Sequence, residues 1–194
     1  LLYDHRSEKA KLAKLVILKS EFFHEIVDME KTSLAKRSRK LFTLSAFYNA
    51  CAELLEGLAI GDLEKDAKLA RNFWEETAKH FPAWKQVRKG GLAASEIREG
   101  YIHSHGVALQ SIAKAGNELL KNKNNWQKYL KELDKIDWSR ANTKLWEGRA
   151  MIGGKVSKSN INIVLTTNVI KKQWGLQLTE EEQRIEDVHL KYKR

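Results

Sequence analysis

The sequence predicts a mainly α-helical domain with a bundle-like arrangement, and three observations support this fold class. The 194 residues include one proline, Pro82. Along most of the chain, apolar residues recur three and four positions apart, which is the spacing of one face of an α-helix. The composition, 42% apolar with six Trp, six Phe and five Tyr, can bury enough surface to offset the entropy of folding. We therefore expect one helical domain over residues 1–194.

Capping residues and helix breakers set the first three predicted helices. Ser7 and Asp62 are suited to the N-cap position because their side chains accept hydrogen bonds from the free amides at a helix start. Glycines near 57–61 and the ring of Pro82 end the second and third helices. The expected helices cover residues 7–28, 41–58 and 62–81.

Glycines punctuate the middle of the chain. Two of them, side by side, predict a loop over 89–94, the one weak seam at which a domain boundary could lie. Ser95 is expected to cap a long helix that reaches Leu119 and that could bend at Gly100 or Gly106. A shorter helical stretch is predicted to follow, over 126–133.

Helical spacing fails near 138–158, where we expect an ordered loop containing Trp and Gly. A short hairpin that turns at Gly153 and Gly154 fits this segment. Beyond it we predict one helix over 160–174 and a last helix that starts with a capping box at Thr179. The last helix has few apolar residues, so we expect it to be largely solvated or to dock on another chain.

The charge is strongly positive, since 35 Lys plus Arg against 25 Asp plus Glu give a formal net charge of +10. Such a surface attracts nucleic acid, anionic lipid or acidic protein. No apolar run approaches the roughly 20 residues of a membrane helix, which excludes a helical membrane-spanning protein. The single cysteine, Cys51, excludes an internal disulfide framework and favours a reducing, cytoplasmic setting.

One run of basic residues, here called the first basic cluster, has no acid within it and leads into the second predicted helix. Basic side chains before a helix can grip phosphates, and the helix N-terminus adds its own partial positive charge. The alternative is a solvated loop whose charge only aids solubility. Its members are Lys31, Lys36, Arg37, Arg39 and Lys40.

A second basic cluster consists of Arg140, Lys144, Arg149, Lys155 and Lys158. It is opposed only by Glu147 and is interleaved with tryptophans, hydroxyls, amides and glycines, a mixture suited to phosphates and base edges. The alternative is that the tryptophans anchor an irregular loop and the charges are incidental. From the two clusters we select as DNA contacts Lys36, Arg37, Arg39, Lys40, Arg140, Arg149, Lys155 and Lys158.

Other motifs carry less weight. Residues 160–192 have the layout of a DNA-binding helix-turn-helix, which is also common between packed helices of any function. His103 and His105 would point to opposite sides of a helix, so we expect no metal site. Cys51 lies on an apolar stripe and is expected to be an inert core thiol.

No arrangement of acid, base and nucleophile in the sequence indicates an enzyme. The segment from Gly153 to Ser157 lacks the first glycine of a phosphate-binding loop and the strand-to-helix context that such a loop needs. We therefore expect no catalytic activity and no cofactor.

Several strings along the chain resemble one family, the DndB proteins of the bacterial DNA phosphorothioation, or sulfur modification, systems. The strings span nearly all of the chain, and two of them, LWEGRAMIGG and SRKLFTLS, are long enough to be specific. They are Leu2–Arg6 (LYDHR), Met29–Ser33 (MEKTS), Ser38–Ser45 (SRKLFTLS), Tyr101–Leu109 (YIHSHGVAL), Ile136–Arg140 (IDWSR), Leu145–Gly154 (LWEGRAMIGG), Val156–Ser159 (VSKS) and Glu180–Arg184 (EEEQR).

The resemblance implies a DNA-binding transcriptional repressor of the modification genes, with the double-stranded promoter DNA as its partner. The family's DGQHR motif, carried in a preceding domain, is absent, and the chain opens at Leu1 without an initiator Met. We therefore expect a C-terminal fragment of a longer protein. The alternative is a helical module that binds other sulfur-modification proteins or a second copy of itself, with DNA binding in the missing domain.

Overall fold

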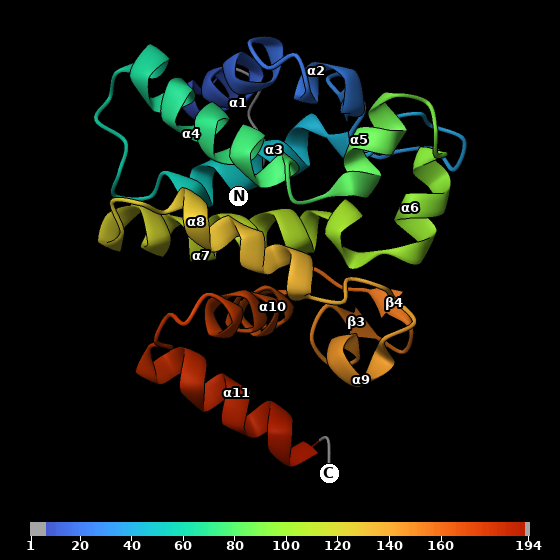
Figure 1. Cartoon of the computed structure of the whole chain (residues 1–194), viewed down its shortest axis with the longest axis vertical. Helices are drawn as coiled ribbons and strands as arrows, with labels where there is room; N and C mark the ends of the chain where they lie inside the picture. The colour runs from blue at the N-terminus through green and yellow to red at the C-terminus, as the bar shows by residue number, and fades with distance from the viewer. Residues whose placement is uncertain (1–6, 193–194) are drawn as a thin grey trace.

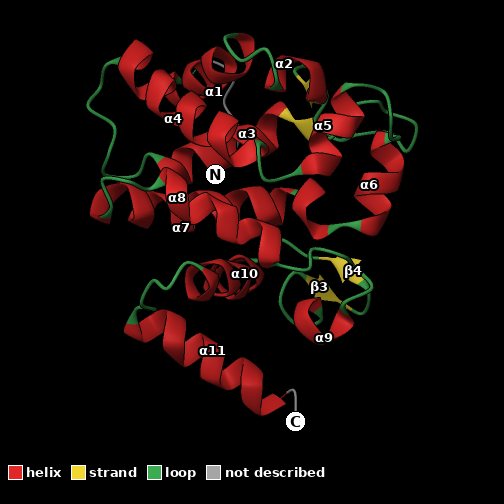
Figure 2. Ribbon diagram, viewed as in Figure 1, coloured by secondary structure: helices red, strands yellow, loops and turns green. Residues whose placement is uncertain are grey.

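The computed structural model describes residues 7–192 and confirms a mainly α-helical fold (Figures 1 and 2). Two small two-stranded sheets accompany the helices in the described part of the chain. The first half contains α1 (Glu8–Leu18), α2 (Phe23–Ile26), β1 (Val27–Asp28), β2 (Phe42–Thr43), α3 (Leu44–Leu54), α4 (Leu63–Ala78), α5 (Pro82–Arg88) and α6 (Ala94–Gly100).

The second half begins with a 3₁₀ turn and the longest helix. Its elements are η1 (Ile102–Ser104), α7 (Gly106–Asn122), α8 (Gln127–Leu130), η2 (Lys131–Lys135), α9 (Thr143–Trp146), β3 (Met151–Ile152), β4 (Lys155–Val156), α10 (Asn160–Gln173) and α11 (Glu180–Tyr192). Helix α7 lies in the middle, with α3 packed on one side and α10 on the other. Helix α11 packs on the outer side of α10, at the bottom of Figure 1.

Buried apolar side chains form one connected core that runs from Ala10 to Trp174. Its centre is aromatic, because Trp84 stacks on Phe81 at 4.3 Å between ring centroids and Phe47 lies 5.4 Å from Trp74. Gly116 of α7 lets this layer approach closely, since a Cβ atom there would lie 2.3 Å from the ring of Phe73.

The predicted N-caps at Ser7 and Asp62 are confirmed, because each side chain accepts a hydrogen bond from an amide in the first turn. The predicted end of the first helix is wrong. Helix α1 stops at Leu18, and buried Ser20 begins a new turn by accepting the Phe23 amide at 3.3 Å. The hydroxyl competes with the helix for backbone groups, which explains the break.

Two further expectations about helix ends are corrected. Pro82 is expected only to end the preceding helix, but it also begins α5. It occupies the first turn of α5, where the missing N–H of proline costs no helical hydrogen bond. The single helix expected from Ser95 to Leu119 is three elements, α6, η1 and α7. The backbone is extended at Tyr101 and His105, and Ala93 rather than Ser95 occupies the N-cap position of α6.

The predicted C-terminal hairpin and capping box are confirmed. Strands β3 and β4 form an antiparallel hairpin around Gly153 and Gly154, both with positive φ. Gly175, with φ of 68°, ends α10. The capping box of α11 is present, since Thr179 and Glu182 exchange hydrogen bonds between side chains and amides. Within residues 7–192, no helix has both the length and the hydrophobicity that crossing a bilayer requires.

Candidate nucleic-acid interface

The first basic cluster lies on the loop that joins β1 to β2. The two strands are parallel neighbours, with Val27 opposite Phe42 and Asp28 opposite Thr43, so both ends of the loop are held together. The Asp28 carboxylate accepts the amides of Lys31 at 2.9 Å and Glu30 at 3.0 Å, and these hydrogen bonds lower its pKa. The start of the loop is therefore a fixed turn.

Arg98 of α6 holds the rest of this loop in place. Its guanidinium donates hydrogen bonds to the carbonyl oxygens of Ala35 (3.1 Å), Lys36 (2.8 Å) and Ser38 (3.2 Å), and also to that of Lys40. Nothing in the sequence indicates this role, because Arg98 stands alone between Ile97 and Glu99 and meets the loop only through the tertiary fold.

The predicted contacts of the first cluster have different surroundings. Lys40 donates to the carbonyl oxygens of His24 and Glu25, so its ammonium group closes the end of α2. Lys36 is exposed and pairs with Glu99 at 3.2 Å. Arg37 and Arg39 are exposed and form no ion pair within the described residues. Of the four predicted contacts in this cluster, these two arginines are the most available to a ligand.

The second cluster is built around the β3–β4 hairpin. Arg140 donates to the carbonyl oxygens of Glu99 at 3.1 Å and Gly154 at 2.8 Å, which ties the hairpin turn to the end of α6. Glu147 accepts the amides of Gly153 and Gly154, so the one acid of this cluster is bonded to the turn.

Lys144, Lys155 and Lys158 are exposed, the first on α9 and the other two on or just after β4. Trp138 and Trp146 stack with ring centroids 5.3 Å apart and donate to backbone carbonyls. Both tryptophans are buried, so they anchor this irregular segment to the core.

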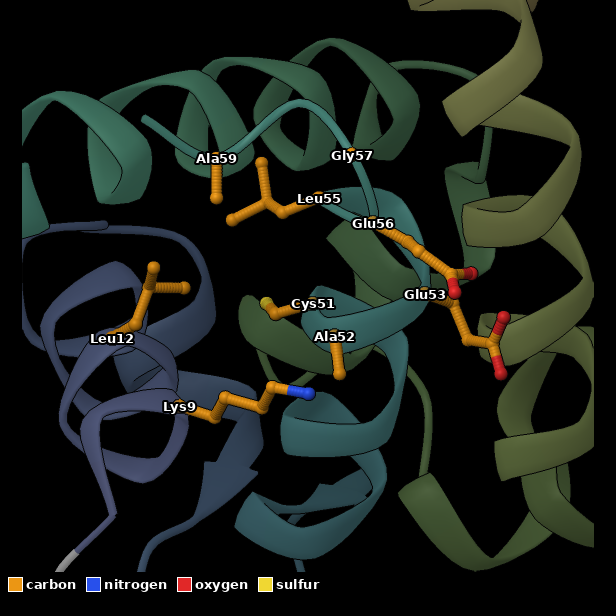
Figure 3. A pocket seen from close by; sticks show the side chains of 9 residues that line it. All are labelled: Lys9, Leu12, Cys51, Ala52, Glu53, Leu55, Glu56, Gly57 and Ala59. Atoms are coloured by element: carbon orange, nitrogen blue, oxygen red, sulfur yellow. The ribbon is translucent and has the colours of Figure 1, made fainter. Parts of the chain in front are cut away.

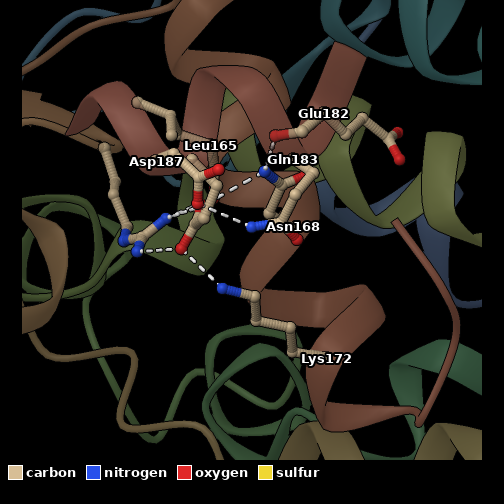
Figure 4. Close-up of polar contacts among 8 residues, drawn as sticks. Leu165, Asn168, Lys172, Glu182, Gln183 and Asp187 are labelled. Carbon is tan, nitrogen blue, oxygen red and sulfur yellow. Dashed lines mark hydrogen bonds and ion pairs between the residues drawn. The ribbon is translucent and has the colours of Figure 1, made fainter. Parts of the chain in front are cut away.

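Arg149 is a correction to the predicted DNA contacts, because it lies in the interior. It forms two hydrogen bonds to Glu186 of α11, at 2.6 and 2.8 Å, and a third to the Leu165 carbonyl oxygen. Figure 4 shows this network, in which Lys172 and Asn168 bond the same carboxylate. A guanidinium so enclosed cannot contact a duplex on the surface.

The two clusters meet at the C-terminal end of α6. Glu99 pairs with Lys36 through its carboxylate and bonds Arg140 through its carbonyl oxygen. Figure 1 shows the loop, α6 and the hairpin along the same side of the molecule. The sequence predicts each cluster separately, whereas their union depends on contacts between distant segments.

A polar pocket of about 420 Å³ lies beside this junction. It is lined by Thr32 from the loop of the first cluster and by Val156 and Lys158 from the second. The remaining lining residues come from the first turns of α3 and α7 and the residues around them. The two clusters thus share a pocket wall as well as Glu99.

The predicted helix-turn-helix segment has a different character. Most of α10 is buried, between α7 and α11. The first turn of α11 is acidic, with Glu180, Glu181 and Glu182, and its buried residues are Glu182 and Glu186. An acidic helix start repels DNA phosphates, so neither helix has the properties of a recognition helix.

The two histidines and the cysteine have structural surroundings. His103 accepts a hydrogen bond from the Trp84 indole at 3.0 Å, and burial lowers its pKa to about 3. His105 bonds the Arg98 carbonyl oxygen at 2.7 Å. Cys51 lines an apolar cavity of about 390 Å³ with Leu12 and Leu55 (Figure 3), and burial raises its pKa to about 12. Such a thiol is a poor nucleophile at neutral pH.

Comparison with known proteins gives one result. The family model DndB, described as DNA-sulfur modification-associated, matches residues 1–177, which leaves α11 outside the match. Neither the curated proteins nor the solved structures provide a significant match.

Proposed function

This chain belongs to the DndB family, which is associated with DNA sulfur modification, and from that premise we propose that it is a double-stranded-DNA-binding repressor of the modification genes. In this proposal the protein binds promoter DNA through the surface formed by the two basic clusters. Repression follows because the bound protein occupies the promoter.

The junction of the two clusters at Glu99 is the observation that carries this proposal. Phosphate groups along a duplex form a line of negative charge, and a surface that joins basic groups from two segments can contact several of them at once. Arg37 and Arg39 are the exposed arginines of the first cluster, and Lys155 and Lys158 are exposed lysines of the second. All four lack ion pairs within the described residues, so their charge is available to phosphates.

The surface is also preorganised. Arg98 bonds four carbonyl oxygens of the loop and Arg140 bonds the hairpin turn, so the loop and the turn are fixed before DNA arrives. A segment that is already ordered loses less conformational entropy on binding, which raises affinity. Arg98 and Arg140 therefore serve as positioning residues.

The test is the salt dependence of duplex binding, measured by fluorescence anisotropy with a labelled promoter duplex. Replacing two phosphate-contacting residues, as in Arg37→Ala with Arg39→Ala, is expected to reduce the slope of log affinity against log salt by about 1.8. The matched control is Lys68→Ala with Arg71→Ala, which removes the same charge from α4, a helix outside both basic clusters.

The proposal predicts that the control retains the slope of the unmodified protein. Equal losses in both double variants would instead mean that net charge alone attracts DNA, and would overturn the proposed surface. The proposed surface would also be overturned if a variant that lacks Arg37, Arg39, Lys155 and Lys158 bound the promoter with unchanged affinity.

A second candidate function is a helical protein-interaction module of the modification system. It is favoured by the exposed apolar side chains of α11, where Val188 is 47%, Leu190 45% and Tyr192 89% exposed. Replacing these three residues with Ser distinguishes the two functions. Loss of self-association or partner binding, with duplex affinity intact, would favour the interaction module.

A further inference from the structure

The polar pocket beside the junction has the size of a small-ligand site. Its volume of about 420 Å³ falls within the range of pockets that hold small molecules. Its polar side chains come from four separate segments of the chain. These are the β1–β2 loop, the end of β2 together with α3, the start of α7 with the residue before it, and the residues after β4. They are Thr32, Thr43, Ser45, Asn49, His105, Gln110 and Lys158.

The chemistry of the lining favours an anion. None of the described residues that line the pocket is acidic, and Lys158 is the one with a permanent charge. Hydroxyl groups of Thr and Ser, amides of Asn and Gln, and a lysine ammonium are all hydrogen-bond donors to phosphate oxygens. A cation would find no carboxylate among them.

Several of these donors have no partner in the folded chain. The side chains of Thr32, Asn49, Gln110 and Lys158 form no hydrogen bond or ion pair with other residues in 7–192. The lining therefore offers four polar side chains whose hydrogen-bonding groups are unused within the described residues.

The backbone adds further donors. Gly106 and Val107 line the pocket and are the first residues of α7, whose N-cap residue, His105, forms no side-chain capping bond. The first amides of a helix have no partner within the helix and carry a partial positive charge. Helix α3 also begins here, and Lys158 directly precedes the N-cap of α10.

We propose that this pocket binds the phosphate group of a nucleotide unit, with Lys158 and the first turn of α7 contacting the phosphate and Asn49 and Gln110 contacting the remainder. The phosphate can belong to the backbone of bound DNA or to a free nucleotide. The inference deepens the proposed function, and its DNA form rests on that function, whereas its free-nucleotide form does not.

The test titrates the full chain with inorganic phosphate and with adenosine monophosphate by isothermal titration calorimetry. Lys158→Ala removes the charge, and Gln110→Glu places a carboxylate in the pocket without changing side-chain size. Each is expected to weaken binding by about tenfold or more, which corresponds to the loss of one charge-assisted hydrogen bond. The matched controls are Lys68→Ala on α4 and Gln127→Glu on α8, which lie outside both the pocket and the two basic clusters.

Competition identifies the source of the phosphate. If saturating adenosine monophosphate displaces a labelled duplex, or if Gln110→Glu alone weakens duplex binding, the ligand is the DNA backbone. If the nucleotide binds while duplex affinity is unchanged, the ligand is a free nucleotide. Both results support the pocket.

The inference is overturned if neither probe binds the unmodified chain and Gln110→Glu leaves duplex affinity unchanged. It is also overturned if the control variants lose as much affinity as the pocket variants. If the chain still binds the duplex when either of these results is obtained, only the pocket is ruled out and the proposed repressor function stands. Conversely, nucleotide binding without any duplex binding would overturn the repressor function and retain the pocket.

Discussion

Arg98 shows how a single residue can organise a binding surface without belonging to it. Its guanidinium bonds the backbone of Ala35, Lys36, Ser38 and Lys40, which carry the first basic cluster. The fork of an arginine can bond several carbonyl oxygens at once, whereas lysine offers one compact ammonium group. The function of Arg98 therefore depends on its shape as well as its charge.

Replacing Arg98 by Lys is expected to lower duplex affinity although it keeps the charge. The loop from 35 to 40 would lose its backbone clamp and would have to be ordered on binding, with a cost on the order of tenfold in affinity. Amide hydrogen exchange in this loop should become faster in the same variant. Arg71→Ala is the control, because it removes a charge from α4 and leaves the clamp intact. Slow exchange together with unchanged affinity in Arg98→Lys would contradict the positioning role.

Glu186 has the opposite character, since it is an acid enclosed by basic groups. Burial on its own would raise its pKa, but hydrogen bonds from Arg149, Lys172 and Asn168 prevail and lower the pKa to about 2. A carboxyl group whose pKa is lower in the folded than in the unfolded state stabilises the fold above the unfolded value, near 4.5, and loses this contribution as the pH falls toward 2.

The free energy of unfolding should therefore fall by up to about 3 kcal/mol from this group between pH 5 and pH 2. Glu186→Gln should make this part of the pH profile flatter. It should also destabilise the protein at pH 7 by about 3–5 kcal/mol, because Arg149 remains buried without a counter-charge. Urea denaturation at a series of pH values measures both effects. Asp187→Asn, at an exposed neighbouring position, is the control and should change neither.

At the scale of the elements, local sequence determines where helices start better than where they break. Side-chain caps at Ser7, Asp62 and Ser159 involve residues three positions apart, so the sequence reveals them. The break between α6 and α7 depends instead on Tyr101, which bridges Ser139 far along the chain. Apolar spacing continues through this break, and for that reason a single helix was the natural prediction.

Helix α7 depends on a glycine at its contact with α4. Gly116→Ala should destabilise the protein by about 1–3 kcal/mol, because the added methyl group would overlap the buried ring of Phe73. The higher helix propensity of Ala offsets part of this loss. Gly100→Ala is the matched control, since a Cβ atom there meets nothing within 4 Å and φ is not positive. The two melting temperatures should therefore move apart, and equal shifts would contradict the close contact.

At the scale of the whole molecule, the sequence predicts the parts of the candidate interface but not their assembly. Both basic clusters are visible as runs of Lys and Arg. Their junction requires Glu99, which is an acid and carries no sign of its role in the sequence. Arg149 shows the converse case, because this basic residue of the second cluster is buried against a helix that begins only at Glu180. Charge patterns reveal composition, whereas the tertiary fold decides which charges reach the surface.

Helix α11 is held to the rest of the molecule mainly through charged groups. The ammonium group of Lys171 is enclosed between Glu118 at 2.5 Å and Glu182 at 2.6 Å, and Arg149 bonds Glu186. Apolar residues of α11, by contrast, are largely exposed. Removing the helix would therefore leave Arg149 without its ion-pair partner and Lys171 with Glu118 of α7 alone, rather than open an apolar core.

Ending the chain after residue 178 should reduce the free energy of unfolding by about 3–5 kcal/mol, because breaking a buried ion pair leaves a charge without compensation. Replacing the unpaired cation, with Arg149→Met in the shortened chain, should restore part of that loss, since an apolar group needs no counter-charge. Urea denaturation measures both steps. If the methionine restores nothing, apolar contacts rather than ion pairs hold α11, and the electrostatic account of its docking is wrong.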